Sequence, residues 1–591
     1  MSSQQSGGHE AGVRLLVIVG LVVGGGGFVI GLLLWLAGQL AALLSGNGWP
    51  DAGPGDALKI LLKFLRDPSH PALAWPEAAR SAFGPTWLFL FILVIFLAGA
   101  AYLATHAVRL AENIRRRRGI RLLRLGFASP YEVSRLLGSK AVLRKAKTIR
   151  PSLNGRVRPA DVGFRLGHDH RSRQDLYASV EESFVIVGPP RQGKDALFCV
   201  PFTIDAPGPV IVTSSRIDVF LNTYAMRAEK GTVHVFDPNG MTQWPERMRW
   251  SPIRGCEAGA TAATRANAML QVAGLPELGA GAPHVTAAFT VLRGYLHAAA
   301  LERRTLTDLI RWANEQVSPE PIDILQRQFA AGRAAPGWAE ALAAVTVKGD
   351  PHTRGLAFAN LTLALDCFND LQVLQECSPR ADDLFDMKEF LSGPNTLYIL
   401  GREGKSGGIA PVVTAMVEDL FAMARSTANL SPGGRLDPPL TVELNDAAHI
   451  APTPKLPMYM GDSGAFSISV HAYFQSLAQA RLRWGAAEAQ TIWENANVRV
   501  VLGGSGNASD LEDVSRLMGE TEDRTGRRRV LSVDEIRTLK FGQAVMIAGS
   551  SRPIEARLTP FWKRKDGDKI MSGRKETEQR VKGYKEAAAR R

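Results

Sequence analysis

The first feature of the hydrophobic pattern is a pair of long uncharged stretches near the start of the chain. Residues 15–44 and 86–108 contain no Asp, Glu, Lys or Arg, and the second stretch is rich in Leu, Phe and Ile. About 20 apolar residues in a helix cross the hydrocarbon core of a bilayer, so each stretch predicts a membrane span. A cleaved signal peptide has a shorter apolar core and is not followed by a second span. We therefore expect a membrane domain over residues 1–125.

The positions of basic residues predict how these spans are oriented. The loop 45–85 has four basic and four acidic residues, whereas four consecutive Arg at 115–118 follow the second span. Basic residues next to a span favour the cytoplasmic side. Both termini and the main body are then cytoplasmic in a two-span protein of the cell membrane. Anionic membrane lipid is the first partner expected for the Arg run, and nucleic acid is the alternative.

Beyond the membrane domain, short apolar runs alternate with longer segments that suit helices. This alternation predicts an α/β fold, in which helices cover a mainly parallel sheet. Between about residues 257 and 377 such runs stop and Ala/Leu-rich segments take over, which predicts an all-helical insertion. The expected strands are 183–187, 209–213, 233–236, 396–400, 440–444, 466–470, 498–502 and 544–548.

Composition adds that most of the chain folds and that its charge is concentrated in two places. The 591 residues are 46% hydrophobic and 21% charged, values typical of three or four globular domains. Of the net charge of +13, residues 109–124 (seven Arg, one Glu) and residues 562–591 (eleven basic, five acidic) each carry +6. We expect 562–591 to be a solvated tail, partly helical or disordered, and non-specific contact with phosphates is the weaker alternative. The four Cys lack metal-site spacing, which predicts reduced core thiols.

A glycine-rich motif follows the first expected strand directly. Its spacing, G-x-x-x-x-G-K, is that of a phosphate-binding loop, and the preceding strand supplies the expected context. Glycines let backbone N–H groups close around a phosphate, and the Lys adds a positive charge for the β- and γ-oxygens. An Asp stands where Ser or Thr is usual. The expected nucleotide-binding residues are Gly188, Pro189, Pro190, Arg191, Gln192, Gly193, Lys194, Asp195 and Ala196.

An enzyme with such a loop needs a second polar site, at the end of a neighbouring strand, to hold Mg²⁺ and to orient the attacking water. The best candidates are Asn445 and Asp446, which follow the expected strand 440–444. Asn445 stands where a metal-binding Asp is expected, and Asp446 where a catalytic Glu is expected. The alternative is a core strand that ends in an ordinary polar turn.

Several stretches, in a fixed order along about 400 residues, resemble a known family. They are VIVGPPRQGKD, PGPVIVTSSRIDVF, HVFDPNG with RMRWSPIRGCE, LNDAAHIAP, FQSLAQARLRWG, RVVLGGSGNASDLEDVSRLMGE and FGQAVMIAGSSRPIEARL. From about residue 167 to 562 the chain is similar to the coupling proteins of type IV secretion and conjugation. The resemblance implies a hexameric, membrane-anchored ATPase that uses ATP and Mg²⁺. It also implies as partners the secretion channel and DNA, single-stranded and bound to a relaxase.

The resemblance also implies a domain plan and the roles of individual residues. A RecA-like nucleotide-binding domain occupies 126–256 and 378–561, the insertion 257–377 engages substrate, and 562–591 is a basic C-terminal tail. Asn445 and Asp446 occupy the family's Asp-Glu pair. Gln475 matches a strand-end Gln that senses the γ-phosphate, and an ordinary strand-end polar residue is the alternative.

Two departures from the family pattern decide between a protein that hydrolyses ATP and one that does not. Asn445 brings no charge to a metal, and Asp446 is one methylene shorter than Glu, which puts hydrolysis in question. In one interpretation Asp195 supplies the missing carboxylate, so that Asp195, Asn445 and Asp446 are the metal ligands. In the other, Asp195 repels phosphate and the site has decayed.

The first functional hypothesis is therefore an ATPase that drives or gates DNA transfer across the membrane. The alternative is a membrane receptor or scaffold that docks the transfer complex, binding nucleotide without hydrolysing it or binding none. A DNA pump of the chromosome-segregation type is disfavoured, because the helical insertion fits the coupling proteins better.

Overall fold

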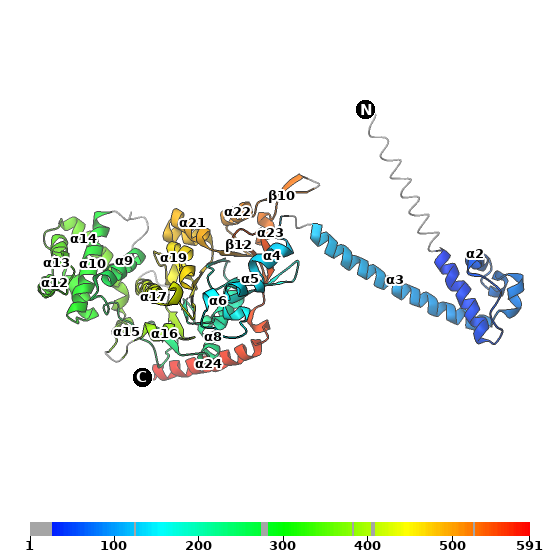
Figure 1. Cartoon of the computed structure of the whole chain (residues 1–591), viewed down its shortest axis with the longest axis horizontal. Coiled ribbons are helices and arrows are strands. Elements are labelled where there is room, and N and C mark those ends of the chain that lie inside the picture. The colour runs from blue at the N-terminus through cyan, green and yellow to red at the C-terminus, as the bar shows by residue number, and fades with distance from the viewer. Residues whose placement is uncertain are drawn as a thin grey trace, which may run out of the picture. The chain divides into compact units, whose positions relative to one another are not determined.

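The computed structural model describes residues 27–122, 126–273, 282–380, 383, 385–402, 408–523 and 526–590, and at 107–122 and 523 only the backbone. The chain forms two compact units, Met1–Leu123 and Arg124–Arg591 (Figure 1). The first unit contains both expected membrane spans. The second contains the expected sheet and insertion.

Two helices of the first unit are long and apolar enough to cross a membrane, judged by length and composition. They are Gly27–Leu44 and the Thr86–His106 part of α3 (Thr86–Leu122). Residues 15–26 of the first expected span lie outside the described residues. The expected Arg run at 115–118 lies on the backbone of α3 beyond its apolar part.

The segment between these helices folds against them. It consists of η1 (Pro54–Asp56), α2 (Ala57–Arg66), η2 (Pro71–Ala74) and η3 (Glu77–Ala82). Trp75 is fully buried, and a Cβ at Gly38 would lie 2.1 Å from its indole ring. Only a glycine lets the first helix pack this closely on Trp75, so the two helices and the intervening segment share one small core with Phe89.

An eleven-stranded sheet organises the second unit, in the order β2-β1-β13-β12-β9-β3-β8-β7-β4-β6-β5. From β9 to β5 all neighbouring strands are parallel, and from β2 to β9 all are antiparallel. The predicted α/β fold is confirmed. The strands are β1 (Gly163–Asp169), β2 (Asp175–Ser179), β3 (Phe184–Val187), β4 (Val210–Ser214), β5 (Val233–Phe236), β6 (Thr396–Leu400), β7 (Leu440–Leu444), β8 (Ile468–Phe474), β9 (Val498–Leu502), β12 (Gln543–Ala548) and β13 (Ile554–Arg557).

Helices cover both faces of this sheet, and a small hairpin of β10 (Glu520–Asp523) and β11 (Gly526–Arg529) stands apart from it. The helical segments outside the insertion are α4 (Pro130–Leu137), α5 (Ser139–Arg144), α6 (Ala146–Ile149), η4 (Pro159–Asp161), η5 (Asp195–Cys199), α7 (Val200–Asp205), α8 (Asp218–Ala228), α16 (Met387–Leu391), α17 (Ala410–Leu430), η7 (Pro432–Gly434), α18 (Ala447–Ile450), α19 (Leu456–Asp462), η8 (Ser463–Phe466), α20 (Leu477–Trp484), α21 (Ala486–Asn495), α22 (Ala508–Leu517), α23 (Val533–Arg537), η9 (Phe561–Lys563) and α24 (Gly567–Ala589).

Between β5 and β6 the described residues form helices and no strand. The helices before α16 are α9 (Gly259–Ala273), α10 (Pro283–Leu301), α11 (Leu306–Glu315), α12 (Glu320–Ala330), α13 (Trp338–Thr346), α14 (Pro351–Leu365), η6 (Asp366–Asn369) and α15 (Leu371–Glu376). The buried Arg265 of α9 pairs with Asp419 of α17 at 2.7 Å, which ties the insertion to the sheet domain.

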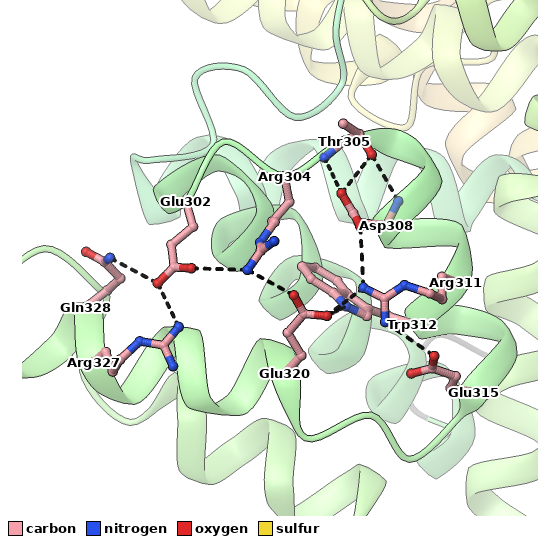
Figure 2. Close-up of polar contacts among 10 residues, drawn as sticks. All are labelled: Glu302, Arg304, Thr305, Asp308, Arg311, Trp312, Glu315, Glu320, Arg327 and Gln328. Carbon is pink, nitrogen blue, oxygen red and sulfur yellow. Dashed lines mark hydrogen bonds and ion pairs between the residues drawn. The ribbon is translucent and has the colours of Figure 1, made fainter.

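An ion-pair network joins consecutive helices of the insertion (Figure 2). Glu320 at the start of α12 pairs with Arg311 at 2.5 Å and with Arg304 at 3.1 Å. Glu302, after α10, pairs with Arg327 at 2.9 Å and with Arg304 at 3.6 Å. Arg304 thus bridges two carboxylates, and the turn between α10 and α11 is fixed against α12.

The basic C-terminal segment forms α24, which packs along α8. A Cβ at Gly573 would lie 2.6 Å from the Ala225 Cβ, so the two helices are in close contact. The guanidinium of Arg580 lies 4.8 Å from the ring of Trp244, which also makes an edge contact with Tyr584. The tail is therefore helical and packed on the body along one face, and contact with phosphates stays a prediction.

Candidate nucleotide-binding site

The expected phosphate loop starts from the middle of the parallel part of the sheet. β3 is buried on both faces, with Phe184 and Ile186 in the core on one side and Val185 on the other. The N–H of Gly188 donates to the carbonyl of Phe474, at the end of β8, over 3.1 Å. The loop therefore lies at the carboxyl edge of parallel strands, where α/β proteins bind their ligands.

The backbone of the loop has the conformation of an anion-binding concavity. Arg191 and Gly193 adopt left-handed φ values of 66° and 86°, and such residues in a tight loop turn neighbouring N–H groups toward a common side. The N–H of Leu197 then donates to Gly193 over 2.8 Å and begins the helix η5–α7. η5 has π-helical spacing, and Pro201, which has no N–H, cannot restore the α-helical bond to Leu197.

Lys194 is buried in this loop, and its ammonium donates to the Gly188 carbonyl over 2.5 Å. Burial lowers the pKa of Lys194, whereas the carboxylates of Asp195 and Asp446 act in the opposite direction. A buried cation is stabilised by any anion that enters the site, so this geometry favours a phosphate.

The second expected site meets the loop across β8. The buried residue Asn445, directly after β7, lies beside Asp195 and acts to lower the pKa of that carboxyl group. Asp446 adopts a left-handed conformation with φ 54° and accepts a hydrogen bond from the Ser215 hydroxyl. Ser215 follows β4, the other neighbour of β7. The ends of three parallel strands thus contribute to one polar cluster.

The ionised form of Asp195 is unfavourable in this cluster. Burial raises the pKa of Asp195, the carboxylate of Asp446 raises it further, and Lys194 and Asn445 act in the opposite direction. Two carboxylates that repel each other, with an amide oxygen beside them, are a fitting set of ligands for Mg²⁺. The described residues contain no group of three or more His, Cys, Asp or Glu side chains placed around one ion. A magnesium ion here would need phosphate and water oxygens as well.

Gln475 lies at the end of the strand between the two motifs. It follows β8, which pairs with both β3 and β7, and its N–H donates to the Gln479 side chain over 3.1 Å. Its sensing role stays a prediction.

Two residues that contact the site, Ser215 and Phe541, were not among the residues expected from the sequence. The sequence signal for Ser215 is the polar run that ends β4, within the stretch PGPVIVTSSRIDVF. The second residue is Phe541, whose ring lies against Gly193: a Cβ on this glycine would be 2.5 Å from Phe541 Cε2. Nothing local in the sequence signals that contact.

Comparisons with known proteins agree with the expected resemblance. Residues 439–541 match the family model described as the TraM recognition site of TraD and TraG. This match confirms the resemblance to type IV coupling proteins, and the matched segment contains Asn445, Asp446 and Gln475. Among curated proteins no sequence matches significantly.

Solved structures with a similar arrangement include the bacterial conjugative coupling protein TrwB and VirB4. The unbound, N-terminally shortened TrwB is 17% identical, covering 64% of this chain and 85% of its own, with a TM-score of 0.47. TrwB with a non-hydrolysable ATP analogue is 19% identical, covering 64% and 86%, with a TM-score of 0.48. VirB4 of Thermoanaerobacter pseudethanolicus is 14% identical, covering 67% and 96%, with a TM-score of 0.36.

Proposed function

We propose that this chain is a coupling protein of a conjugative type IV secretion system, which binds ATP and Mg²⁺ and drives or gates DNA transfer across the cell membrane. One observation carries the proposal. Asn445, inside the segment that the family model matches, lies beside Asp195 of the phosphate loop and acts to lower the pKa of its carboxyl group. The family's second motif and the loop therefore form a single site.

The residues of this site have complementary roles in the proposal. The N–H groups of the loop and the Lys194 ammonium bind the β- and γ-phosphates. Bound Mg²⁺ would neutralise phosphate charge. Asp195, Asn445 and Asp446 offer oxygens to hold it. Because Asp195 is charged where the usual residue is neutral, and Asn445 is neutral where the usual residue is charged, the formal charge around the ion is unchanged.

The other parts of the chain extend this proposal to the membrane and to partners. The apolar helices Gly27–Leu44 and Thr86–His106 are long enough to anchor the protein as two spans. The body and both termini are cytoplasmic in this proposal, as the basic residues after the second span favour. The insertion engages the relaxase-bound single strand, other surfaces engage channel components and lipid, and six copies form a ring.

A receptor that binds nucleotide without hydrolysing it is the second candidate. The observation that favours it is the contact of Asp446 with the Ser215 hydroxyl. A carboxylate that is held by a neighbouring side chain, and is already one methylene short of Glu, is poorly placed to orient an attacking water.

The test is an assay of ATP binding and hydrolysis by the full-length chain in lipid nanodiscs, with and without single-stranded DNA. The motor predicts Mg²⁺-dependent hydrolysis that DNA stimulates, and the receptor predicts binding alone. Lys194→Ala should abolish nucleotide binding and transfer in both cases. The control is Lys147→Ala, at an exposed position of α6 outside the insertion. Full transfer by Lys194→Ala would leave only a scaffold that uses no nucleotide.

A further inference from the structure

An aromatic ring from a distant part of the chain lies against the phosphate loop. The Phe541 ring is in contact with Gly193, where any Cβ would approach the ring to 2.5 Å. Only glycine at this position lets the loop keep this contact. Phe541 is nevertheless 49% exposed. A single exposed apolar side chain is ordinary on a protein surface, so the significance of Phe541 lies in its position against the phosphate loop.

A second exposed aromatic ring extends this surface. Trp562, in η9, is stacked on Phe541 with ring centroids 6.1 Å apart and ring planes inclined by 13°. Trp562 is 42% exposed. The two rings together form an exposed aromatic pair that starts at the phosphate loop.

The segment that carries Phe541 is held in place on both sides. The Gly504 N–H donates to the Arg537 carbonyl over 2.8 Å, and the Leu558 N–H donates to the Gly542 carbonyl over 2.8 Å. On the loop side, the Gln192 side chain is packed against Gly504, where a Cβ would lie 2.5 Å from its amide nitrogen. The Phe541 ring is therefore pre-positioned relative to residues 188–194, which lowers the entropy cost of using it for binding.

We propose that Phe541 and Trp562 are the stacking platform for the base of the nucleotide whose phosphates occupy the loop at residues 188–194. This inference rests on the proposed nucleotide site. The base of a nucleotide lies one ribose beyond its α-phosphate, and the Phe541 ring touches the loop itself. Stacking on aromatic side chains tolerates any base but increases with ring area. The platform therefore selects purine over pyrimidine nucleotides and treats ATP and GTP alike.

The experiment compares two probes on the full-length protein in nanodiscs: ATP, and inorganic tripolyphosphate, which has the phosphates but no base. Phe541→Leu keeps an apolar side chain against Gly193 but removes the aromatic face, and Phe541→Tyr keeps that face. We expect Phe541→Leu to weaken ATP binding roughly ten-fold, within the range measured for loss of one base–aromatic stack. Its affinity for tripolyphosphate should not change, and Phe541→Tyr should bind both probes normally. Trp562→Leu should also weaken the binding of ATP and leave the binding of tripolyphosphate unchanged.

Phe329→Leu is the matched control, because Phe329 is 52% exposed on the insertion and is far in sequence from the loop. It should leave both affinities unchanged. Equal loss of ATP and tripolyphosphate in Phe541→Leu would make Phe541 a structural support of the loop and overturn the platform. Unchanged ATP affinity, or equal binding of ATP and CTP by the wild type, would also overturn it. If the wild type bound neither probe, the proposed nucleotide site would be wrong, and the proposed platform would be wrong with it.

Discussion

Asn445 lies beside Asp195 and acts to lower the pKa of its carboxyl group, although the two residues belong to motifs separated by the whole helical insertion. Both residues depart from the pattern usual for their motif, and the departures are opposite in charge. Their contact means that a carboxylate supplied from either position would reach the same place in the site.

This contact predicts the behaviour of variants in which the carboxylate is moved. Asn445→Asp alone adds a negative charge beside the triphosphate and should not increase nucleotide binding. Asp195→Thr alone should remove Mg²⁺ dependence. Asp195→Thr combined with Asn445→Asp should preserve or raise Mg²⁺-dependent binding, measured by titration of ATP with and without the metal. A strong gain in ATPase activity from Asn445→Asp alone would instead identify a decayed ordinary site.

The ionised Asp195 should destabilise the protein that holds no ligand. Because the pKa of Asp195 is raised in the folded state, the fold prefers the protonated form, and stability falls as pH rises from about 4 through the raised pKa. Asp195→Asn should therefore stabilise the ligand-free protein at pH 8 by about 1–2 kcal/mol and have little effect near pH 4. Thermal unfolding at the two pH values measures this difference. An equal or lower melting temperature at pH 8 would contradict the prediction.

A buried polar network beneath the site should be important for stability. His471 Nδ1 lies 2.8 Å from Glu443, its Nε2 lies 2.8 Å from Ser469, and the Tyr473 hydroxyl donates to Glu443 over 2.7 Å. Glu443→Leu leaves two polar side chains without this partner and should cost about 3–5 kcal/mol. Tyr473→Phe, which removes one bond, should cost about 1–2 kcal/mol. Urea unfolding measures both, and a cost below about 1 kcal/mol for Glu443→Leu would be inconsistent with this role.

The ion-pair network of the insertion should make α11 and α12 sensitive to acid. The hydrogen bond from Arg311 lowers the pKa of Glu320, so this stabilisation is complete above about pH 4.3 and is lost as pH falls through the lowered pKa. Glu320→Gln should increase hydrogen exchange in α11 and α12 at pH 7 and differ little from wild type at pH 3. The ion pair between Arg311 and Glu320 contributes under about 1 kcal/mol to stability, because it is partly exposed. Glu340→Gln, at an exposed position of α13, is the control, and an equal effect from it would contradict the assignment.

Local patterns in the sequence determined the parallel half of the sheet and the phosphate loop. β5, β6, β7 and β9 lie at their expected residues, and β3 and β4 within one residue of them, because central parallel strands are short runs of apolar residues. The spacing of Gly188, Gly193 and Lys194 is also local, since one turn of backbone fixes it. The absence of strand signals likewise indicated the helical insertion before β6.

Of the antiparallel strands, β12 begins one residue before its expected range, whereas β1, β2 and β13 were not predicted. β1 contains an irregularity in its pairing with β2 between Arg165 and Gly167, which breaks the alternation that marks a half-buried strand. β8 begins two residues later than expected and extends to Phe474, because Ser467 adopts a left-handed φ of 58° and ends the preceding turn.

Only the order of strands in the sheet decided which distant residues meet. Asp446 contacts Ser215 because β7 lies beside β4. Phe541 contacts Gly193 although no periodicity relates them. Such contacts arise from long-range strand pairing, which depends on the packing of the whole chain. A motif can therefore indicate which chemistry a site performs, whereas only the tertiary structure shows which distant residues complete the site.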